Sequence, residues 1–596
     1  MLIQHSFDHL SSSLEEVKER LMRQTLETLI FEQIIHVEKK ESEWMITGKT
    51  THDQRVAYTF EAEQKWSFGR VKIKRHSLKR ESGVCTDVHL FLEEVVKNNI
   101  SGGQINEFIQ ELLETLSKDH QSKQVQPEHI PKSDLHYEAL ESHMVDGHPY
   151  HPSYKSRIGF SLCDNAKYGP EHDRPISVYW IAVDTELLHI ALAEQTNVEK
   201  ILTEHLGKEE KDRYLKVLNE KGNRNKYYTL LPVHPWQWVH RIQSVFAQQL
   251  ADRDMIVLGR SEETYRAQQS IRSLAHRTNE KATYIKCPLS ITNTSSSRIL
   301  ASHTVWNAPM ISDWLQTLID QDSFLQQKRF SLLREVMGVS LKYDHLTPIQ
   351  YESAYGTLGA IYRENVSTYL DEGEEAWPLN AITHVQKNGV PLIQFACQRH
   401  GVEPWREALI EAVAVPLVHL LCVHGIALEA HAQNIILVLE DQWPKRIIVK
   451  DLHDGVRYVP EKLLDSQRMP SLHPEPENHR RVNRYSFIEA KTPDEVRDYL
   501  YDAFFFICMT EIAFVFECFG LSEKSFWRKC AQVIRNYQRN HPEYKQRYEQ
   551  FDLFAEEILI EEMTKRRILG DSEWHFLKVT NPLRKAEGSQ DERKPS

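Results

Sequence analysis

A short stretch near residue 430 carries polar side chains at a spacing that suits metal and phosphate chemistry. It begins with Glu429, His431 and Asn434, continues through two apolar runs separated by a turn at 441–444, and ends on Asp451. We interpret the runs as a β-hairpin that returns Asp451 to the first three side chains. Carboxylate and amide oxygens are ligands for a hard cation such as Mg²⁺, and the imidazole can donate to a phosphate or a carboxylate. A solvated hairpin with ordinary polar loops is the alternative.

A second polar segment lies at 146–160, where two His-Pro steps hold the backbone extended because a residue before proline avoids the helical region. It gathers His148, His151, Lys155 and Arg157. Such groups suit a polyanion, either a polycarboxylate or a triphosphate. A histidine-rich surface loop hydrated by water is the alternative. A histidine metal site is disfavoured because the loop has no second carboxylate or thiolate at ligand spacing.

A third segment, residues 266–298, places hydroxyl and basic side chains on both sides of a predicted strand at 283–291. Hydroxyl-rich turns can offer N–H and hydroxyl donors to phosphate, and arginine adds bidentate contacts. The segment lacks the glycine spacing of a Rossmann or P-loop motif, so polar turns alone explain it equally well. A P-loop at 47–50 is rejected because Glu43 stands where that motif requires glycine. The candidate residues are Ser270, Arg272, Ser273, Lys286, Thr292, Thr294 and Arg298.

The composition is that of a globular protein with more than one domain. A chain of 596 residues is too long for one core, and the formal charge of −12 argues against a nucleic-acid partner. The 8 cysteines are scattered without a CxxC pair, which disfavours disulfides and a cysteine-based zinc site and favours a reducing compartment. We expect no signal peptide and no membrane span, because the most apolar window, 503–519, is interrupted by two glutamates. A cytoplasmic protein is therefore expected.

The remaining pattern predicts helices mixed with short strands. The polar segment 119–134 is predicted to be a linker. His419 and His424, on an apolar helix at 404–424 interrupted by Pro416, are expected to be hydrogen-bonded core residues and not ligands. The other predicted elements are strands at 43–48, 55–60, 66–75, 176–183 and 228–238, helices at 13–36, 87–98, 105–117, 196–206, 208–220, 309–336, 350–370, 493–518, 524–539 and 544–567, and a disordered tail from 585.

Five motifs, reaching from 146 to 455, occur in the order found in the IucA/IucC family of siderophore synthetases, which work independently of nonribosomal peptide synthetases; the chain resembles this family. The motifs are DGHPYHPSYKSRIGF, PVHPWQW, QQSIRSL followed by YIKCPLSITNTSSSR, EAHAQN and KDLHDG. The resemblance implies an α+β fold shaped as a cupped hand. Its thumb would be 1–135, its fingers 136–345 and its palm 346–596, with ATP bound between fingers and palm.

The resemblance also implies a reaction. A carboxylate of citrate or of a citryl monoamide would attack the α-phosphate of ATP in the presence of Mg²⁺, giving an acyl adenylate and pyrophosphate. An amine, an N-hydroxylated diamine or a polyamine would then form the amide and release AMP. The first motif, followed by Tyr168-Gly-Pro-Glu171, is more similar to members that act on monoamidated citrate than to those that act on free citrate. Many members are dimeric, so a homodimer is expected.

Individual roles follow from the same resemblance. Ser273 stands where some members have threonine, and His453 within the last motif leaves Asp454 without an assigned metal role. The ATP site would contain Ser270, Arg272, Ser273, Lys286, Thr294, Arg298, His431 and Asn434; Mg²⁺ would bind Glu429, Asn434 and Asp451; the substrate would contact His148, His151, Lys155, Arg157, Arg298 and His431; and Lys286, Thr294, Arg298 and His431 would be catalytic.

Two other functions stay open at this point. The order Glu429, Asn434, Asp451 is similar to that of aminoglycoside-type small-molecule kinases, which release ADP, but Glu replaces their Asp and the glycine-rich loop is missing. A citrate- or siderophore-binding protein without turnover would use the same cationic loops. The C-terminal helices also resemble ferric-siderophore reductase-like domains. Those domains cluster cysteines near the C-terminus, whereas this chain has none after Cys530.

Overall fold

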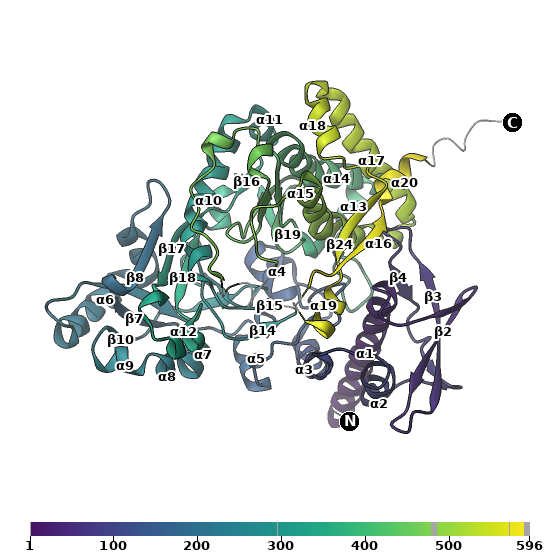
Figure 1. The fold of residues 1–596 in the computed structure, drawn as a ribbon, viewed down its shortest axis with the longest axis horizontal. Coiled ribbons are helices and arrows are strands. Elements are labelled where there is room, and N and C mark those ends of the chain that lie inside the picture. Colours follow the sequence, from purple (N-terminus) through teal and green to yellow (C-terminus); the bar gives the residue numbers. More distant parts are fainter. Residues whose placement is uncertain (1, 295, 478, 480–484, 571–572, 589–596) are drawn as a thin grey trace.

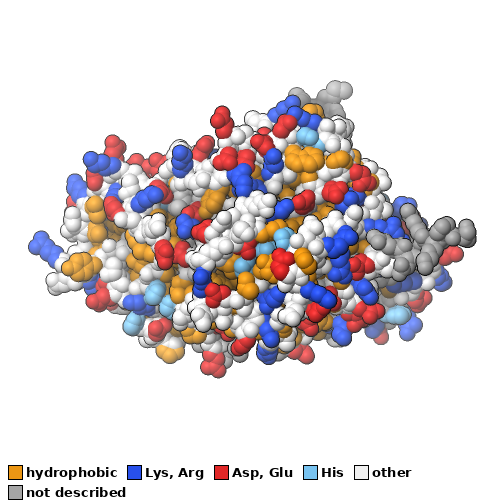
Figure 2. All heavy atoms as spheres, turned by 90° about the horizontal axis from the view of Figure 1, so that it is seen from above, with side chains coloured by type: hydrophobic (Ala, Val, Ile, Leu, Met, Phe, Trp, Pro, Cys, Tyr) orange, Lys and Arg blue, Asp and Glu red, His pale blue; other side chains and the backbone are white. Residues whose placement is uncertain are grey.

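The computed structural model describes residues 2–294, 296–477, 479, 485–570 and 573–588, and it combines helices with sheets that are mainly antiparallel. The predicted α+β class is confirmed at this level. Figure 1 shows helix α1 and the first sheet at one end of the long axis, and helix α6 with a three-stranded sheet at the other. On the face shown in Figure 2, basic and acidic side chains are interspersed, and neither sign covers it alone.

The N-terminal part is a long helix packed beside an antiparallel sheet in the order β1-β2-β3-β5-β6, with β4 paired to β3. Leu21 and Leu29 lie eight residues apart on one face of α1 and are fully buried. The rejected P-loop segment ends strand β2 and enters a hairpin, not a helix. The elements are α1 (Leu2–Phe31), β1 (Glu38–Lys40), β2 (Glu43–Lys49), β3 (Arg55–Gln64), β4 (Val71–Ile73), β5 (Lys79–Arg80), β6 (Gly83–Val84), α2 (Val88–Phe91), the π-helical η1 (Leu92–Lys97), α3 (Ile105–Val125), η2 (Lys132–Asp134) and α4 (Tyr137–His143).

The middle part holds a three-stranded sheet, β10-β7-β9, and a six-stranded sheet, β11-β12-β13-β18-β17-β8. The two helices predicted at 196–206 and 208–220 are confirmed as the halves of α6, which bends at Gly207, where φ is +63°. The elements are α5 (Leu162–Tyr168), η3 (Pro170–His172), β7 (Tyr179–Asp184), η4 (Thr185–Leu187), β8 (Leu188–Leu192), α6 (Val198–Lys221), β9 (Tyr228–Val233), α7 (Pro235–Gln237), η5 (Trp238–Ile242), α8 (Gln243–Val245), α9 (Ala247–Ala251), β10 (Met255–Arg260), β11 (Tyr265–Ala267), β12 (Ser273–His276), β13 (Tyr284–Lys286), β14 (Thr292–Asn293), β15 (Ser296–Ser297), α10 (Ser302–Gln321), α11 (Ser323–Gln327), β16 (Ser331–Leu332), β17 (Glu335–Leu341) and η6 (Tyr343–His345).

The C-terminal part surrounds a four-stranded sheet, β16-β22-β21-β19, in which β21 and β22 form the predicted hairpin. The elements are α12 (Pro348–Ala354), β18 (Gly359–Arg363), η7 (Val366–Tyr369), β19 (Glu374–Pro378), η8 (Leu379–Thr383), α13 (Gln394–His400), α14 (Val402–His419), η9 (Leu420–His424), β20 (Ile426–Leu428), β21 (Ile435–Glu440), β22 (Trp443–Val449), β23 (Val456–Tyr458), η10 (Pro460–Lys462), η11 (Ser466–Arg468), α15 (Pro493–Leu500), η13 (Tyr501–Met509), α16 (Thr510–Glu517), α17 (Glu523–Asn540), η14 (Pro542–Tyr544), α18 (Lys545–Gln550), β24 (Glu557–Glu561), α19 (Met563–Leu569), β25 (Phe576–Thr580) and α20 (Pro582–Gly588).

Some helix predictions in the second half are wrong. The helix predicted at 350–370 ends at Ala354, and the following residues form the fully buried strand β18. The helix predicted at 309–336 ends at Gln321 and is followed by the short helix α11 and strand β17. The helix predicted at 544–567 is interrupted by strand β24. Each of these strands pairs in a sheet, and that tertiary pairing overrides the local pattern.

Two segments predicted to be flexible are ordered within the described residues. Helix α3 continues through Asp119 to Val125, so the predicted linker begins inside a helix, where the Asp119 carboxylate is fully buried in ion pairs. The tail predicted from 585 begins with helix α20, and Lys585 Nζ lies 3.9 Å from the centre of the Trp66 ring. The rest of that tail, 589–596, lies outside the described residues.

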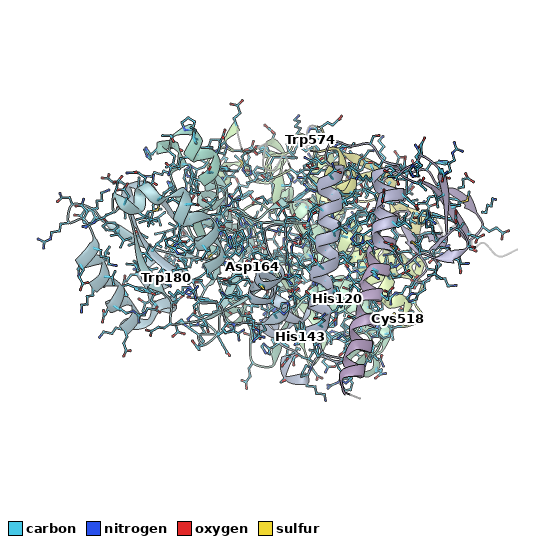
Figure 3. All side chains as sticks on the ribbon, turned by 90° about the horizontal axis from the view of Figure 1, so that it is seen from below. His120, His143, Asp164, Trp180, Cys518 and Trp574 are labelled. Carbon is cyan, nitrogen blue, oxygen red and sulfur yellow. The ribbon has the colours of Figure 1, made fainter. Side chains whose placement is uncertain are left out.

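Two large apolar cores hold the fold together. One joins the N-terminal sheet to the C-terminal helices, for example through Phe68 against Trp527, with ring centres 5.5 Å apart. The other surrounds the fully buried Trp180, labelled in Figure 3. Two helical stretches, Val402–His424 and Pro493–Glu517, are long and apolar enough for a membrane span by length and composition, but 83% and 78% of their apolar windows are buried in these cores. The expectation of a buried helix at 503–519 is thereby confirmed, and six of the eight cysteines are buried thiols.

Replacing Gly338 with alanine is expected to destabilise the protein by about 3 kcal/mol. Gly338 lies on β17 under helix α10, and an added Cβ would overlap the carbonyl oxygen of Val305. The contact is with backbone, so a rotamer change cannot relieve it. Thermal unfolding of Gly338→Ala should show a lower Tm, whereas Gly103→Ala, with nothing within 4 Å of the added Cβ, should match the wild type. Equal Tm values for both variants would contradict this packing.

Candidate active site

A cavity of about 1800 Å³ brings together the three polar segments of the sequence. Two candidates of the third segment, Ser273 on β12 and Thr292 on β14, do not line this cavity. The buried hydroxyl of Ser273 has no hydrogen-bond partner within the described chain. The cavity is lined by His148, His151, Lys155, Arg157, Ser270, Arg272, Lys286, Thr294, Arg298, Glu429, His431, Asn434 and Asp451. The structure therefore gathers thirteen of the fifteen candidate residues around one space.

Two arginines from neighbouring turns lie side by side in this cavity. Arg272 is the last residue of the β11–β12 turn and donates from Nη1 to the backbone carbonyls of Arg298 and Ile299, at 3.0 and 2.5 Å. Arg298 follows the β14–β15 hairpin, and its Nη2 lies 3.4 Å from Thr294 Oγ1. Burial lowers the pKa of Arg298 to about 10, and the charge of Arg272 adds to this effect. Neither guanidinium pairs with a carboxylate among the described residues, so the two positive charges are free to bind an anion.

Asp451, which follows the β21–β22 hairpin, holds two further cations in place. Lys286, at the end of β13, places Nζ 2.9 Å from Asp451 Oδ1, and Arg363, at the end of β18, places Nη1 2.5 Å from the same oxygen. Burial alone would raise the pKa of Asp451, but the charges of Lys286 and Arg363 hold it well below its usual value. Both contacts fall on Oδ1, so one aspartate orients two cations and still presents Oδ2.

A buried glutamate supports the same wall from behind. Glu335, the first residue of β17, lies 2.5 Å from His453 Nδ1 through Oε1, and its Oε2 has no partner among the described groups. The other ring nitrogen of His453 is 3.3 Å from Lys286 Nζ. Glu335, Asp451 and His453 also place one possible ligand atom each within 4.8 Å of the others. The ammonium of Lys286 lies against Asp451 and His453 and supplies the positive charge that a metal ion would otherwise bring to this cluster.

The loop before the hairpin presents oxygen ligands without a paired cation. The Glu429 backbone N–H donates to Gly455 at 2.8 Å, and Asn434 Nδ2 donates to the Glu429 carbonyl at 3.1 Å, which holds both ends of the stretch together. The Glu429 carboxylate makes no hydrogen bond or ion pair with the described residues. Burial raises its pKa to about 7, and the charges of Asp454 and Asp451 add to this effect. Burial lowers the pKa of His431 to about 4, so its imidazole is neutral near pH 7.

The two histidines of the first motif are also neutral. His148 Nδ1 accepts the backbone N–H groups of Tyr150 and His151, at 3.1 and 2.8 Å, which leaves its Nε2 as the donor. Burial lowers the pKa of His148 to about 3 and holds that of His151 well below its usual value. His151 Nε2 is buried without a partner within the described chain. These side chains offer imidazole hydrogen bonds to the cavity and no positive charge.

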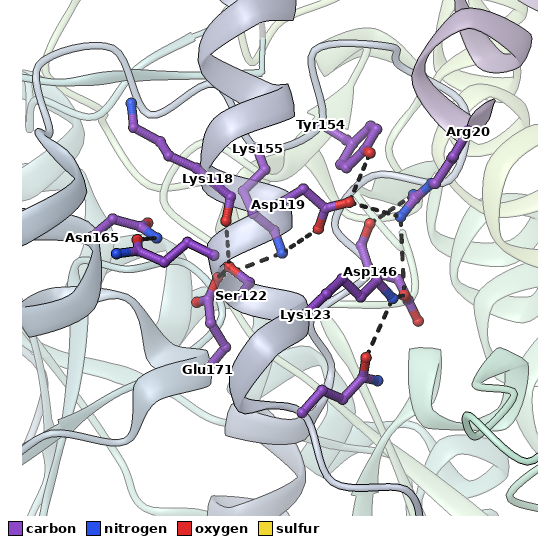
Figure 4. A network of polar contacts seen from close by, with 12 residues as sticks. Arg20, Lys118, Asp119, Ser122, Lys123, Asp146, Tyr154, Lys155, Asn165 and Glu171 are labelled. Atoms are coloured by element: carbon purple, nitrogen blue, oxygen red, sulfur yellow. Dashed lines mark hydrogen bonds and ion pairs between the residues drawn. The ribbon is translucent and has the colours of Figure 1, made fainter. Parts of the chain in front are cut away.

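The two cations of the first motif are already neutralised, which revises the expectation that they face a bound polyanion. Lys155 Nζ lies 2.8 Å from Asp119 Oδ1 and 3.5 Å from Glu171 (Figure 4). Arg157 binds Glu171 through two parallel contacts of 3.0 Å. All four side chains are buried, and the Tyr154 hydroxyl donates to Asp119 at 2.8 Å. This network ties helix α3 to the motif loop and fixes the position of His148 and His151.

Replacing Asp119 with asparagine is expected to lower the free energy of unfolding by about 3 kcal/mol, because Lys155 would keep a buried charge without its main partner. The loop should also lose its fixed position, so the affinity for the substrate should fall. Tm and KM measure the two effects. The control is Asp212→Asn, an exposed aspartate on α6 without an ion pair among the described residues. A Tm for Asp119→Asn equal to that of the control would show that the network contributes nothing.

Sequence reasoning missed the residues that support the candidates from other elements. Glu335 and Arg363 lie in apolar strands, where no motif marks them, and their partners are 118 and 88 residues away along the chain. The polar residues around Asp119 favour a linker in the sequence, although the position is helical. Glu171 stands in the Tyr168–Glu171 motif, and nothing in the sequence links it to Arg157. The sequence offers one indication of such residues: a charged side chain within an apolar strand or helix needs a partner of opposite charge when it is buried.

Comparison with known proteins gives two family matches and close full-length relatives. The IucA / IucC family model matches residues 136–384, and the ferric iron reductase FhuF-like transporter model matches 403–573. The chain is 38% identical to the 2-[(L-alanin-3-ylcarbamoyl)methyl]-3-(2-aminoethylcarbamoyl)-2-hydroxypropanoate synthase of Staphylococcus aureus (strain NCTC 8325 / PS 47), over 96% of this chain and 93% of that protein. It is 36% identical to the citryl-spermidine/3,4-dihydroxybenzoyl-citryl-spermidine:spermidine ligase of Bacillus anthracis, over 96% and 94%. The crystal structure of petrobactin biosynthesis protein AsbB from Bacillus anthracis str. Sterne superimposes with a TM-score of 0.89 at 35% identity, covering 98% of this chain and 97% of that one.

Proposed function

Because this chain belongs to the IucA/IucC family of siderophore synthetases and is an ATP-dependent ligase, we propose that it joins a carboxylate of a citryl monoamide to an amine. The Bacillus anthracis relative is named for citryl-spermidine and spermidine, and the Staphylococcus aureus relative for a hydroxypropanoate that carries two carbamoyl groups. These names support a substrate that already holds one amide. The nucleophile would be an amine, an N-hydroxylated diamine or a polyamine.

One observation carries this proposal: Arg272 and Arg298 line the cavity without a carboxylate partner among the described residues. ATP and a carboxylate are both anions, so bringing them together requires positive charge that no protein carboxylate has already neutralised. Charges that are largely buried act on a bound anion more strongly than charges in bulk solvent do. A protein built only to bind citrate would not need a cavity of about 1800 Å³, which has room for a nucleotide as well.

The chain's own residues supply charge and position for two steps. In the first, a carboxylate oxygen attacks the α-phosphorus and the bond to pyrophosphate breaks, while Arg298 and Lys286 stabilise the negative charge on phosphorus. Thr294 and the neutral imidazole of His431 would hold the carboxylate by hydrogen bonds. In the second step, the amine nitrogen attacks the acyl carbon, the bond to AMP breaks, and the amine proton passes to solvent. A hydroxylamine is neutral near pH 7, so no strong general base is required.

We also propose that Glu429, Asn434 and Asp451 hold Mg²⁺. The Glu429 carboxylate and the Asp451 Oδ2, neither of which has a partner among the described residues, form with the amide oxygen of Asn434 the hard oxygen set that this ion prefers. When bound, Mg²⁺ would neutralise charge on the phosphates and on the departing pyrophosphate. Asp454, whose buried Oδ1 has no partner within the described chain, lies beside the set and is a further oxygen donor.

The larger arrangement is part of the same proposal. The thumb would be 1–135, the fingers 136–345 and the palm 346–596, with ATP between fingers and palm, because Arg272, Lys286 and Arg298 come from the second range and Glu429 and Asp451 from the third. We propose that the protein acts in the cytoplasm as a homodimer, without a nucleic-acid or membrane partner. Eight free cysteines, six of them buried, are compatible with a reducing compartment.

The nucleotide products test the proposed function. Purified protein would receive ATP, Mg²⁺, citrate or a citryl monoamide, and excess hydroxylamine as a surrogate nucleophile. AMP, pyrophosphate and a citryl hydroxamate are expected, with faster turnover of the monoamide. ADP and a phosphorylated product would instead identify a kinase. Saturable citrate binding without nucleotide cleavage would identify a binding protein.

A further inference from the structure

A cluster of two histidines and one aspartate lies away from the cavity, and none of its members lines that space. Asp322 is the residue between α10 and α11, His419 ends α14, and His424 ends the π-helical segment η9. One possible ligand atom from each lies within 4.8 Å of the other two. The proposed reaction uses none of these side chains.

The three side chains converge on one point. Nε2 of His419 is 2.9 Å and Nε2 of His424 is 2.7 Å from the same oxygen, Oδ2 of Asp322. The prediction that both histidines are hydrogen-bonded core residues is thus confirmed, and the proposal below revises only the expectation that they are not ligands. In a tetrahedral site with bonds of about 2.0 Å, neighbouring ligand atoms lie about 3.3 Å apart. The two Nε2–Oδ2 distances are therefore about 0.5 Å shorter than those of a tetrahedral site, and the two Nε2 atoms lie within 4.8 Å of each other.

The helix geometry places the two imidazoles on one face. His419 and His424 are five residues apart, a spacing that an α-helix puts about 140° around its axis. The segment from Leu420 to His424 is π-helical, and its i to i+5 repeat brings the second histidine back over the first. Such π segments are frequent at functional sites, and this one follows Pro416, which cannot donate a backbone hydrogen bond.

Contacts with neighbouring residues orient Asp322 and His419, and each of the two keeps one ligand atom directed at the middle of the cluster. Asp322 Oδ1 accepts the Leu325 N–H at 2.9 Å as the N-cap of α11, which aims Oδ2 at the histidines. His419 Nδ1 lies 2.6 Å from the Tyr537 hydroxyl, and Phe324 stacks on the His419 ring with centres 4.4 Å apart. A second hydrogen bond from the far nitrogen of a histidine is typical of metal ligands.

We propose that Asp322, His419 and His424 bind one divalent transition-metal ion of the zinc type. Two imidazole nitrogens and one carboxylate oxygen suit such an ion, whereas Mg²⁺ and Ca²⁺ prefer oxygen ligands alone. The side chains of His424 and Asp322 are 10% and 11% exposed, which leaves an edge for a water as fourth ligand. The ion would replace the two Nε2–H···Oδ2 hydrogen bonds. The imidazoles of His419 and His424 would then carry their proton on Nδ1 instead of Nε2. The hydroxyl oxygen of Tyr537 would accept a hydrogen bond from Nδ1 of His419. The site would join α11, α14 and α17.

The test is a Co²⁺ titration of the metal-stripped full-length protein, followed by competition with Zn²⁺. With Mg²⁺ in excess to fill the proposed oxygen-ligand site in the cavity, one Co²⁺ per chain with the visible bands of a low-coordinate site is expected. His424→Ala should weaken binding by at least about 100-fold, and Tyr537→Phe by about 10- to 100-fold. The matched control is His541→Ala, whose ring is 5.1 Å from Phe324 but outside the ligand set.

Two results would overturn the proposal. The first is that the wild-type protein binds no Co²⁺ or Zn²⁺ at metal concentrations well above that of the protein. This result can be interpreted without any variant. Alternatively, the bound ion would persist in both His419→Ala and His424→Ala with unchanged affinity. Circular dichroism of each variant shows whether it is folded. A folded His424→Ala that has lost the ion, beside a His541→Ala that retains it, supports the site.

Discussion

Arg298→Ala should lower kcat/KM for ATP-dependent amide formation by about 10²- to 10³-fold, the range seen when one preorganised donor to a developing charge is removed. Arg298 has no carboxylate partner among the described residues, so its charge is available to the reacting anions. Among the described residues, its guanidinium makes hydrogen bonds only with the Asn293 carbonyl and the Thr294 hydroxyl. The substitution therefore breaks no ion pair, and the fold should remain intact.

Steady-state kinetics with varied ATP and varied carboxylate measure this effect. Arg298→Lys keeps the charge but loses the planar fork, so it should recover part of the rate if charge is the main contribution. Arg241→Ala, an exposed arginine on η5, is the matched control and should have wild-type kinetics. If Arg298→Ala retained wild-type kcat/KM with both substrates, the arginine pair could not be the anion site.

Asp451→Asn should have the second large effect and should change activity and stability together. The carboxylate holds Lys286 and Arg363 at 2.9 and 2.5 Å, and both cations are nearly fully buried. Removing one partner of a buried pair typically costs about 3–5 kcal/mol because the remaining charge is uncompensated. Lys286 would also lose its fixed position, so we expect a fall in kcat of at least about 10²-fold.

A double variant separates the two effects. Adding Lys286→Met to Asp451→Asn removes one of the unpaired charges, so Tm should rise toward the wild type while activity stays lost. The non-additive part of the Tm change measures the coupling between the two side chains. Additive Tm changes would contradict the pairing. Recovery of activity at high Mg²⁺ in Asp451→Asn would show that the aspartate acts only as a metal ligand and does not position Lys286.

The elements that could be predicted from the sequence are those with a strong local pattern. Strands β2 and β3 alternate buried and exposed residues, and the break at Gly207 lies between two helical patterns. Strand β18 was missed because Gly359–Arg363 is buried on both faces between β13 and β17 and has no alternation to show. A short apolar run of that kind cannot be distinguished from a helix by periodicity.

The site was predictable wherever a motif places its residues close together. Glu429, His431 and Asn434 are neighbours in sequence, and the hairpin that returns Asp451 to them is local. The charge state of the first motif was not predictable, because the partners of Lys155 and Arg157 lie on α3 and after α5. A cation in a loop looks the same in sequence whether a ligand or a buried carboxylate neutralises it, and only the tertiary structure separates the two cases.

The most direct test of the proposed chemistry follows one oxygen atom. The carboxylate substrate would be labelled with ¹⁸O, and the products of a single turnover with ATP and hydroxylamine would be analysed by mass spectrometry. Attack of the carboxylate on the α-phosphorus transfers one labelled oxygen to AMP and none to pyrophosphate. That result is expected here. Label in inorganic phosphate, with ADP as the other product, would mean that the γ-phosphate was attacked and would contradict the adenylation mechanism.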